Sequence, residues 1–533
     1  MPTSELVGRA TKAPASGGPG TDGARTGIWE DFLTLLSRDP QATAVLDDRG
    51  NRMTRWELEA LSADMADEMQ ARGLVSGDVV IICMPNWTEW LAVYLAALRT
   101  GLVPGTLPVT SDPGSIAYVS NLVGARAVFL PSSHRGRSFR DEIGQLAETV
   151  GRRLEVMFAV GDQSGRHWQT IEGPEPVLPD YPAAMAHILF SSSTTGRSKA
   201  IAHSESSLRA YNQAVIDRYG VTGEQSIFMP SPLGHSTGFW HGARMSIMVG
   251  APLVLQERWE PQRALELVSD NNCAITVAAT PFLTDLVEAE WHAETPKLRG
   301  MRAFLCGGAP IPPSLIEKAQ LQMPDTHICS IWAMSEGGAT SSLLEDSVDR
   351  VANTCGRTMA GTELAVLKQD VIASRGSEGE IVMKTPSLFL GYINQTEMYE
   401  KSFTPEGYFR TGDVGIVDDD GYLRITGRLK DIIIRGGVNI SPVEIECALA
   451  SHDSIARIAV LGQPDDRMGE RICAVIQPAG TPPSFEELLV WLEERNVPRR
   501  LWPESIRIVE SMPATPAGKI RKNVLRQDLF GLS

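Results

Sequence analysis

A segment rich in hydroxyl side chains follows an apolar run in the middle of the chain. Residues 191–199 read Ser-Ser-Ser-Thr-Thr-Gly-Arg-Ser-Lys, directly after the strand-like run 186–190. Backbone N–H groups, hydroxyls and one lysine can together wrap a polyphosphate. The spacing is not that of a Walker P-loop, which places Gly-Lys after four intervening residues. Because such composition is also common in solvated turns, the loop needs support from other segments.

Five further segments stand out by their small, aromatic or charged residues. They are Gly307-Gly308-Ala309-Pro310, Trp332-Ala333-Met334-Ser335-Glu336, Thr411-Gly412-Asp413, Gly427-Arg428 and Arg435-Gly436-Gly437. Small residues leave room for a ligand to approach the backbone, and carboxylate oxygens such as those of Glu336 are the ligands that hard cations prefer. Asp413 has two oxygens that can accept from two hydroxyls. Taken singly, these segments are equally typical of ordinary turns and solvated side chains.

A last segment, residues 513–521, reads Pro-Ala-Thr-Pro-Ala-Gly-Lys-Ile-Arg. Together these motifs resemble those of the superfamily of adenylate-forming enzymes, which contains acyl-CoA synthetases, peptide-synthetase adenylation domains and luciferases. The resemblance runs from about Trp29 to Arg521, and the motifs occur in the family's order at compatible spacings. Within the superfamily the chain most resembles medium-chain and cyclohexanecarboxylate CoA ligases.

The resemblance implies a role for each motif. The ATP phosphates would be held by Ser192, Ser193, Thr194, Thr195, Gly196 and Lys199. Adenine would be surrounded by Gly307, Gly308, Ala309, Pro310, Trp332, Ala333 and Met334. Ser335 would contact phosphate, Glu336 would bind Mg²⁺, Asp413 would bind the ribose hydroxyls, and Arg428 would approach the phosphate or ribose. The loop departs from the family pattern at three positions, where Ser193 and Ala200 replace glycines and Ser198 replaces a proline. These departures leave nucleotide binding expected and put loop flexibility and turnover in question.

The resemblance also implies that the C-terminal region adopts two orientations relative to the rest of the chain. Lys519 would be the catalytic lysine that offsets charge as pyrophosphate leaves. Lys430-Asp431 would be a hinge, and rotation about it would bring Gly436 and Gly437 to the site, where small side chains leave room for a pantetheine arm.

The segment 233–238, Leu-Gly-His-Ser-Thr-Gly, indicates which class of acid is the substrate. Amino-acid-activating relatives place an aspartate there to pair the substrate ammonium, and its absence disfavours an α-amino acid. His235 matches a family position beside the substrate carboxylate, although a lone histidine is more often structural. The candidates for an apolar acyl pocket are Phe239, Trp240, Ala279, Phe282 and Cys306. Such a pocket suits an aromatic, alicyclic or medium-chain acid.

The elements that must position these residues alternate between short apolar runs and helical patterns, which predicts helix-covered parallel sheets of the α/β class. Strand-like runs include 79–83, 127–130, 188–190, 252–255 and 275–278, and a helix is predicted around 90–98. A hairpin with the acidic turn 418–421 precedes a smaller α+β region that has strands at 458–461 and 472–476 and a helix near 485–494. We therefore expect a tail (1–27), an N-terminal domain (28–429) and a small mobile C-terminal domain (430–533).

Composition narrows the class of protein. The net charge of −16 and the lack of a Lys/Arg run disfavour a nucleic-acid partner. Apolar runs are too short for a membrane span, no signal peptide is evident, and the seven cysteines lack a C-x-x-C pattern, so we expect buried thiols in a cytoplasmic protein. Oligomeric state is not indicated.

These observations predict an enzyme that uses ATP and Mg²⁺ to convert a small carboxylic acid to acyl-AMP and then forms a thioester with coenzyme A. Two alternatives stay open. The first is an adenylating enzyme that hands acyl-AMP to a carrier protein or partner enzyme, and the second is a nucleotide-binding regulator without catalysis. Retention of Glu336, Asp413 and Lys519 favours an enzyme over a regulator.

Overall fold

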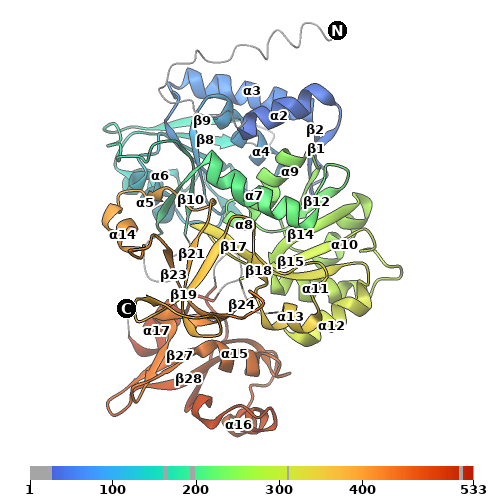
Figure 1. Ribbon diagram of the computed structural model, residues 1–533. Helices are drawn as coiled ribbons and strands as arrows, with labels where there is room; N and C mark the ends of the chain where they lie inside the picture. Colours follow the sequence, from blue (N-terminus) through green and yellow to red (C-terminus); the bar gives the residue numbers. More distant parts are fainter. Residues whose placement is uncertain (1–26, 160–165, 192–197, 309–310, 515–519, 532–533) are drawn as a thin grey trace.

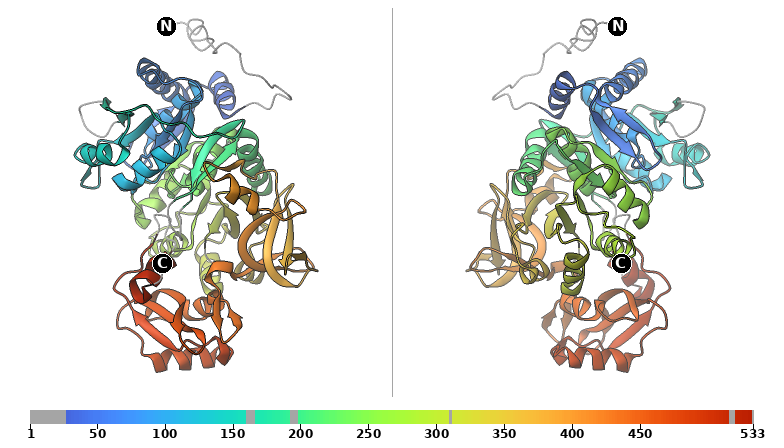
Figure 2. Two further views of the ribbon diagram at one scale, coloured as in Figure 1. Left: turned by 90° about the vertical axis from the view of Figure 1, so that its left-hand side faces the viewer. Right: turned by 90° about the vertical axis from the view of Figure 1, so that its right-hand side faces the viewer.

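The computed structural model describes residues 27–159, 166–191, 198–308, 311–514 and 520–531. Two large sheets form the core of the N-terminal part, and a smaller sheet lies at the opposite end of the molecule from α2 and α3 (Figures 1 and 2). The predicted tail lies outside the described residues, apart from Gly27, which caps α2. Both large sheets carry helices, as the alternating sequence pattern predicted.

The first large sheet has nine strands with a parallel centre. In spatial order they are β18 (Arg357–Thr358), β17 (Gly337–Ser341), β16 (His327–Met334), β15 (Ala303–Gly307), β14 (Cys273–Ala279), β12 (Ser226–Met229), β13 (Leu253–Leu255), β1 (Thr43–Asp47) and β2 (Arg52–Thr54). Strands β16 to β1 in this order are parallel, and the outer pairs are antiparallel. The predicted site motifs at 307–308 and 332–336 lie at the ends of neighbouring strands β15 and β16.

The second large sheet has eight strands. Their order is β22 (Gly391–Tyr392), β11 (Ala200–Ser204), β10 (Met185–Phe190), β4 (Val103–Thr106), β3 (Val79–Ile82), β5 (Ala127–Pro131), β8 (Leu154–Ala159) and β9 (His167–Ile171). All four residues of β3 and all five of β5 are buried, because helices cover both faces, and such strands read as continuous apolar runs. A two-stranded ribbon, β6 (Ser133–His134) and β7 (Arg137–Ser138), follows β5.

Helices of the N-terminal part connect and cover these strands. They are α2 (Ile28–Arg38), α3 (Arg55–Ala71), α4 (Thr88–Arg99), α5 (Pro113–Leu122), α6 (Ile143–Val150), α7 (Glu205–Tyr219), α8 (Ser236–Gly238), η1 (Phe239–Arg244), α9 (Met245–Val249), α10 (Pro261–Asp270), α11 (Thr280–Trp291), α12 (Pro313–Gln322), α13 (Val348–Asn353) and α14 (Thr396–Lys401). The segment η1 is a π-helix, a form often found at functional sites.

The chain then forms two five-stranded sheets. The first contains β20 (Val371–Ile372), β19 (Glu363–Lys368), β21 (Glu378–Lys384), β23 (Phe409–Val417) and β24 (Leu423–Arg428), and the second contains β26 (Val438–Ile440), β25 (Ile433–Arg435), β28 (Gly469–Pro478), β27 (Ile455–Asp465) and β29 (Ser505–Ile508). The second sheet carries α15 (Pro442–Ala450), α16 (Phe485–Glu494) and α17 (Lys522–Phe530), and short 3₁₀ turns η2 (Leu429–Asp431) and η3 (Arg499–Leu501) flank it.

The predicted α/β class with a smaller α+β C-terminal region is confirmed. The helix α16 begins and ends where its pattern indicated, because Ser484 and Glu487 form a capping box at its start. The prediction of buried thiols is wrong for Cys447, which is exposed on α15. No helix in the described parts of the chain is long and apolar enough to cross a membrane.

Candidate active site

The predicted phosphate loop connects two antiparallel strands of the second sheet, β10 and β11. Residues 192–197 lie outside the described part of the chain, and the loop's two ends are described. Ser191 N donates to Lys199 O at 3.1 Å, and Lys199 N donates to Ser191 Oγ at 3.1 Å. This paired contact closes the base of the loop and places Lys199 at the start of β11.

A tyrosine links Lys199 to the predicted metal ligand. The Lys199 ammonium lies 4.7 Å from the centre of the Tyr392 ring, and the Tyr392 hydroxyl donates a 2.9 Å hydrogen bond to Glu336 Oε1. Burial, followed by the nearby Glu336 carboxylate, raises the pKa of Tyr392, so the phenol stays neutral and acts as donor. Lys199 and Glu336, which are far apart in sequence, therefore belong to one cluster. Tyr392 was not predicted from the sequence.

The turn that carries Glu336 is fixed through its backbone. Ser335 and Glu336 form the two-residue connection between β16 and β17, since Met334 pairs with Gly337. His203 Nε2 donates to Ser335 O at 2.7 Å, and Phe389 N donates to Glu336 O at 2.8 Å. Burial lowers the pKa of His203 to about 4, so this imidazole is neutral at pH 7. His203, like Tyr392, was not predicted as a site residue.

Asp413 lies in a second cluster with two other predicted residues. Its carboxylate is buried and accepts from Trp332 Nε1 at 2.8 Å, and Arg428 Nε lies 2.7 Å from its other oxygen. Asp413 and Arg428 are paired across β23 and β24, which explains why the guanidinium reaches it. The structure brings these three residues together and shows that protein groups engage both carboxylate oxygens. The expected contact of Asp413 with ribose hydroxyls stays a prediction.

The predicted adenine turn begins at the end of β15. Gly307 pairs with Ile331, the residue before Trp332, so the turn and the tryptophan lie on adjacent strands. Gly308 has φ of +87°, a conformation that glycine adopts without strain. Ala309 and Pro310 lie outside the described residues. Ala333 and Met334 are the last two residues of β16.

His235 lies between two close backbone approaches. A Cβ at Gly234 would lie 2.0 Å from Leu107 O, and one at Gly238 would lie 2.2 Å from Pro232 O, so both positions require glycine. The His235 Nδ1 accepts from Thr237 N at 3.3 Å and caps the short helix α8.

Four of the five acyl-pocket candidates fall into two groups. Phe239 stacks on His187 at 3.8 Å between ring centres, and Trp240 stacks on Tyr211 at 4.4 Å, within one core cluster. Phe282 contacts Trp259 and packs with Cys306 in a different cluster. Ala279 precedes α11 at the end of β14. The structure does not bring the two groups into one cluster, and the pocket stays a prediction.

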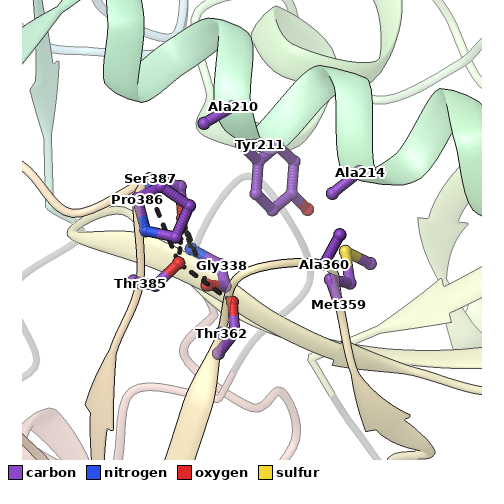
Figure 3. Close-up of a pocket in the computed structure, with 10 residues that line it drawn as sticks. All are labelled: Ala210, Tyr211, Ala214, Gly338, Met359, Ala360, Thr362, Thr385, Pro386 and Ser387. Atoms are coloured by element: carbon purple, nitrogen blue, oxygen red, sulfur yellow. Dashed lines mark hydrogen bonds between the residues drawn. The ribbon is translucent and has the colours of Figure 1, made fainter.

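A small hollow lies beside Gly338 of β17, where this strand faces α7 (Figure 3). Its hydroxyl network holds Gly338, whose N–H donates to Ser387 Oγ at 3.1 Å, while Ser387 Oγ donates to Gly338 O at 3.2 Å. The Tyr211 ring points toward Gly338, and an added Cβ there would lie 1.9 Å from Tyr211 Cε2. Tyr211 also stacks on Trp240, so it connects β17, the strand after Glu336, with one of the acyl-pocket candidates.

The remaining candidates belong to the C-terminal region. Gly436 and Gly437 form the turn between β25 and β26, with φ of +57° and +81°. The predicted hinge residue Asp431 pairs with Arg526 of α17 at 3.2 Å. Lys519 lies outside the described residues.

The family assignment follows from comparison with known proteins. A family model described as AMP-binding enzyme matches residues 34–393, and a model described as AMP-binding enzyme C-terminal domain matches residues 444–519. The chain belongs to the AMP-binding enzyme family. The resemblance inferred from the motifs is confirmed, and so is the prediction of an enzyme.

Similar proteins of this AMP-binding family cover nearly the whole chain. The medium-chain fatty-acid–CoA ligase of Escherichia coli (strain K12) is 31% identical, over 96% of this chain and 91% of that protein. A 3-[(3aS,4S,7aS)-7a-methyl-1,5-dioxo-octahydro-1H-inden-4-yl]propanoyl:CoA ligase of Rhodococcus jostii (strain RHA1) is 28% identical, over 92% and 96%. The structure of ATP-bound MatB from Rhodopseudomonas palustris superposes with a TM-score of 0.79 at 25% identity, covering 94% of this chain and 99% of that one.

The residues of this AMP-binding enzyme fit a magnesium ion bound together with a nucleotide. Mg²⁺ is usually held by one or two carboxylates plus substrate phosphates, not by an all-protein cage. Glu336 is a half-buried carboxylate in the same cluster as the phosphate-loop lysine. Within the described ranges, no group of three or more His, Cys, Asp or Glu side chains could hold a metal by itself.

Proposed function

We propose that this enzyme activates a carboxylic acid with ATP and transfers the acyl group to the thiol of coenzyme A. The observation that carries the proposal is the cluster in which Tyr392 joins Lys199 and Glu336. A lysine at the base of a hydroxyl-rich loop can neutralise phosphate oxygens, and a nearby carboxylate can bind the metal of MgATP. The ligases that resemble the chain, and the ATP-bound structure with its fold, support this assignment.

In the first half-reaction the substrate carboxylate attacks the α-phosphorus of ATP and pyrophosphate leaves. Lys199 and the loop residues 192–196 would hold the leaving phosphates, and Lys519 would sit beside the reacting oxygens and offset their developing charge. The turn 307–310, Trp332 and Asp413 with Arg428 would orient the adenosine, and His235 would lie beside the acid. Bound Mg²⁺ would supply additional charge stabilisation at the phosphates.

In the second half-reaction the thiol attacks the acyl carbonyl, and AMP leaves with the electron pair of the broken C–O bond. We place the domain boundary at the η2 turn, with residues 28–429 as the ATP- and acid-binding domain and 430–533 as the mobile domain. Rotation there would exchange Lys519 for Gly436 and Gly437 at the site.

The proposed substrate class is an acid with an apolar body: aromatic, alicyclic or medium-chain. The buried aromatic residues Phe239, Trp240 and Tyr211 support this choice, because their rings are apolar and supply no charged partner for a substrate ammonium. The relatives named for medium-chain fatty acids and for a bicyclic propanoate support it as well.

The experiment is pyrophosphate release over a panel of carboxylic acids, with and without coenzyme A. We expect release with apolar acids and thioester only when the thiol is present. Release without thioester would favour transfer to a carrier protein or partner enzyme, and no release with any acid would favour a nucleotide-binding regulator.

A further inference from the structure

Tyr392 lies between two groups of opposite charge that have different tasks in the proposed site. The face of its ring carries the Lys199 ammonium, and its hydroxyl holds Glu336 Oε1. Although one side chain is cationic and the other anionic, the structure contains no ion pair between these two described residues, since each contacts the tyrosine instead.

The fold fixes Tyr392 in this place. It is 5% exposed and ends β22, a two-residue edge strand that pairs with β11. Tyr392 pairs with Ile201, two residues after Lys199, so the tyrosine and the lysine are neighbours on adjacent strands. The ring of Phe389 packs against that of Tyr392, with 4.7 Å between the ring centres. The backbone N–H of Phe389 donates to Glu336 O, so the same segment also contacts the Glu336 turn.

We propose that Tyr392 is a positioning residue that keeps Lys199 and Glu336 apart and orients both toward MgATP. The inference rests on the proposed function of the site. The ammonium and the carboxylate both contact Tyr392, so without the ring we expect them to approach each other and form a direct ion pair. Each would then be less available to phosphate or metal. With the ring, the lysine keeps its three donors for phosphate oxygens, because a cation–π contact uses none of its N–H groups in a carboxylate bond. The hydroxyl occupies one oxygen of Glu336 and leaves the other for the metal.

The chain offers a matched control elsewhere. Tyr408 has the same two contacts, since Lys384 lies 4.1 Å from its ring centre and its hydroxyl bonds to Glu363. Glu363 and Lys384 pair at one end of the interior strands β19 and β21, and Tyr408 directly precedes β23. None of the three belongs to the site clusters described above. Identical substitutions at Tyr392 and Tyr408 therefore separate the chemistry of the Lys–Tyr–Glu arrangement from its location.

The test measures equilibrium binding of ATP to the full-length protein, once with the metal removed by chelation and once with saturating Mg²⁺. Tyr392→Phe keeps the ring and removes the hydroxyl, so we expect it to weaken MgATP binding about tenfold, the size expected for one hydrogen bond to a charged group, and to leave metal-free ATP binding unchanged. Tyr392→Leu removes the ring as well and should weaken both. Tyr408→Phe and Tyr408→Leu should change neither.

A double-variant cycle separates positioning from a general structural role. If the tyrosine acts through the carboxylate, Tyr392→Phe should have no further effect on MgATP affinity in a Glu336→Gln background. An equal loss in both backgrounds, or wild-type MgATP affinity in Tyr392→Phe, would overturn the inference and leave the proposed function intact. If the wild-type protein binds neither form of ATP, the proposed function fails and the inference falls with it.

Discussion

The indole Nε1 of Trp332 donates a 2.8 Å hydrogen bond to Asp413 Oδ2, while Arg428 Nε lies 2.7 Å from Oδ1. Asp413 thus anchors a tryptophan from the first large sheet and an arginine from its own hairpin. The two predicted nucleotide contacts are held by the same carboxylate, so a change at Asp413 acts on both.

Asp413→Ala should weaken ATP binding by about 1.5–3 kcal/mol, the range for a hydrogen bond to a charged group. It should also lower the free energy of unfolding by about 1–3 kcal/mol, because it leaves the Trp332 N–H without its acceptor and the Arg428 guanidinium without its ion-pair partner. Calorimetric ATP binding and chemical denaturation measure the two effects. Trp332→Phe is the control that keeps a ring and removes only one donor, and its losses should be smaller. A folded Asp413→Ala protein with wild-type ATP affinity would remove Asp413 from the nucleotide site.

Gly338→Ala should destabilise the protein by about 1–3 kcal/mol, because the new methyl group would overlap the buried Tyr211 ring. Thermal unfolding measures the loss. The neighbouring Gly337 is a matched control, since a Cβ there would find its closest atom at 3.3 Å, and Gly337→Ala should cost less. Adding Tyr211→Leu to Gly338→Ala should recover part of the lost stability. Equal losses at the two glycines would contradict the packing seen at Tyr211.

Acidification should destabilise the folded protein through its buried histidines. Burial lowers the pKa of His203 and of His241 to about 4 from the ordinary 6.5. Between these values the unfolded chain binds more protons than the folded one, so stability rises with pH and is lost as pH falls from 6.5 toward 4. Each histidine should account for about 2 kcal/mol between pH 7 and pH 5.

Urea denaturation at several pH values tests this dependence. His203→Gln removes one titrating group, so the slope of unfolding free energy against pH should become shallower even if the variant is less stable at pH 7. A slope that His203→Gln does not reduce would contradict a neutral buried imidazole at this position.

Lys519→Ala and a bulky side chain at Gly437 should impair different half-reactions, because one small domain cannot place both segments over a single site at once. Lys519→Ala should abolish acyl-AMP formation yet still convert supplied acyl-AMP and coenzyme A to thioester, and Gly437→Leu should do the reverse. Each half-reaction is measured separately.

Backbone strain needs its own control, since Gly437 has a positive φ of +81°. Gly376 has φ of +78°, and like Gly437 it has no atom within 4 Å of an added Cβ, so Gly376→Leu introduces similar strain at a turn of another sheet. That variant should retain both half-reactions. Loss of the same half-reaction in Lys519→Ala and Gly437→Leu would show that domain alternation is the wrong mechanism.

Local patterns in the sequence were enough to predict the family, the class of fold and the elements whose signals are contiguous. The helix α16 and the acidic turn between β23 and β24 are examples, because the groups that stabilise each are within a few residues of one another. The motif residues Lys199, Glu336 and Asp413 could be named for the same reason, since each lies in a short run of recognisable composition.

The tertiary structure decided which of these residues touch. Tyr392 bonds to Glu336 from 56 residues away, and His203 holds the backbone of Ser335 from 132 residues away. Such contacts depend on strand order and register, which place β22 beside β11 and bring the β16–β17 turn to them, and no local spacing encodes that arrangement. The same reason explains why Phe282 and Cys306, adjacent to site motifs in sequence, pack in a different core cluster from Phe239 and Trp240.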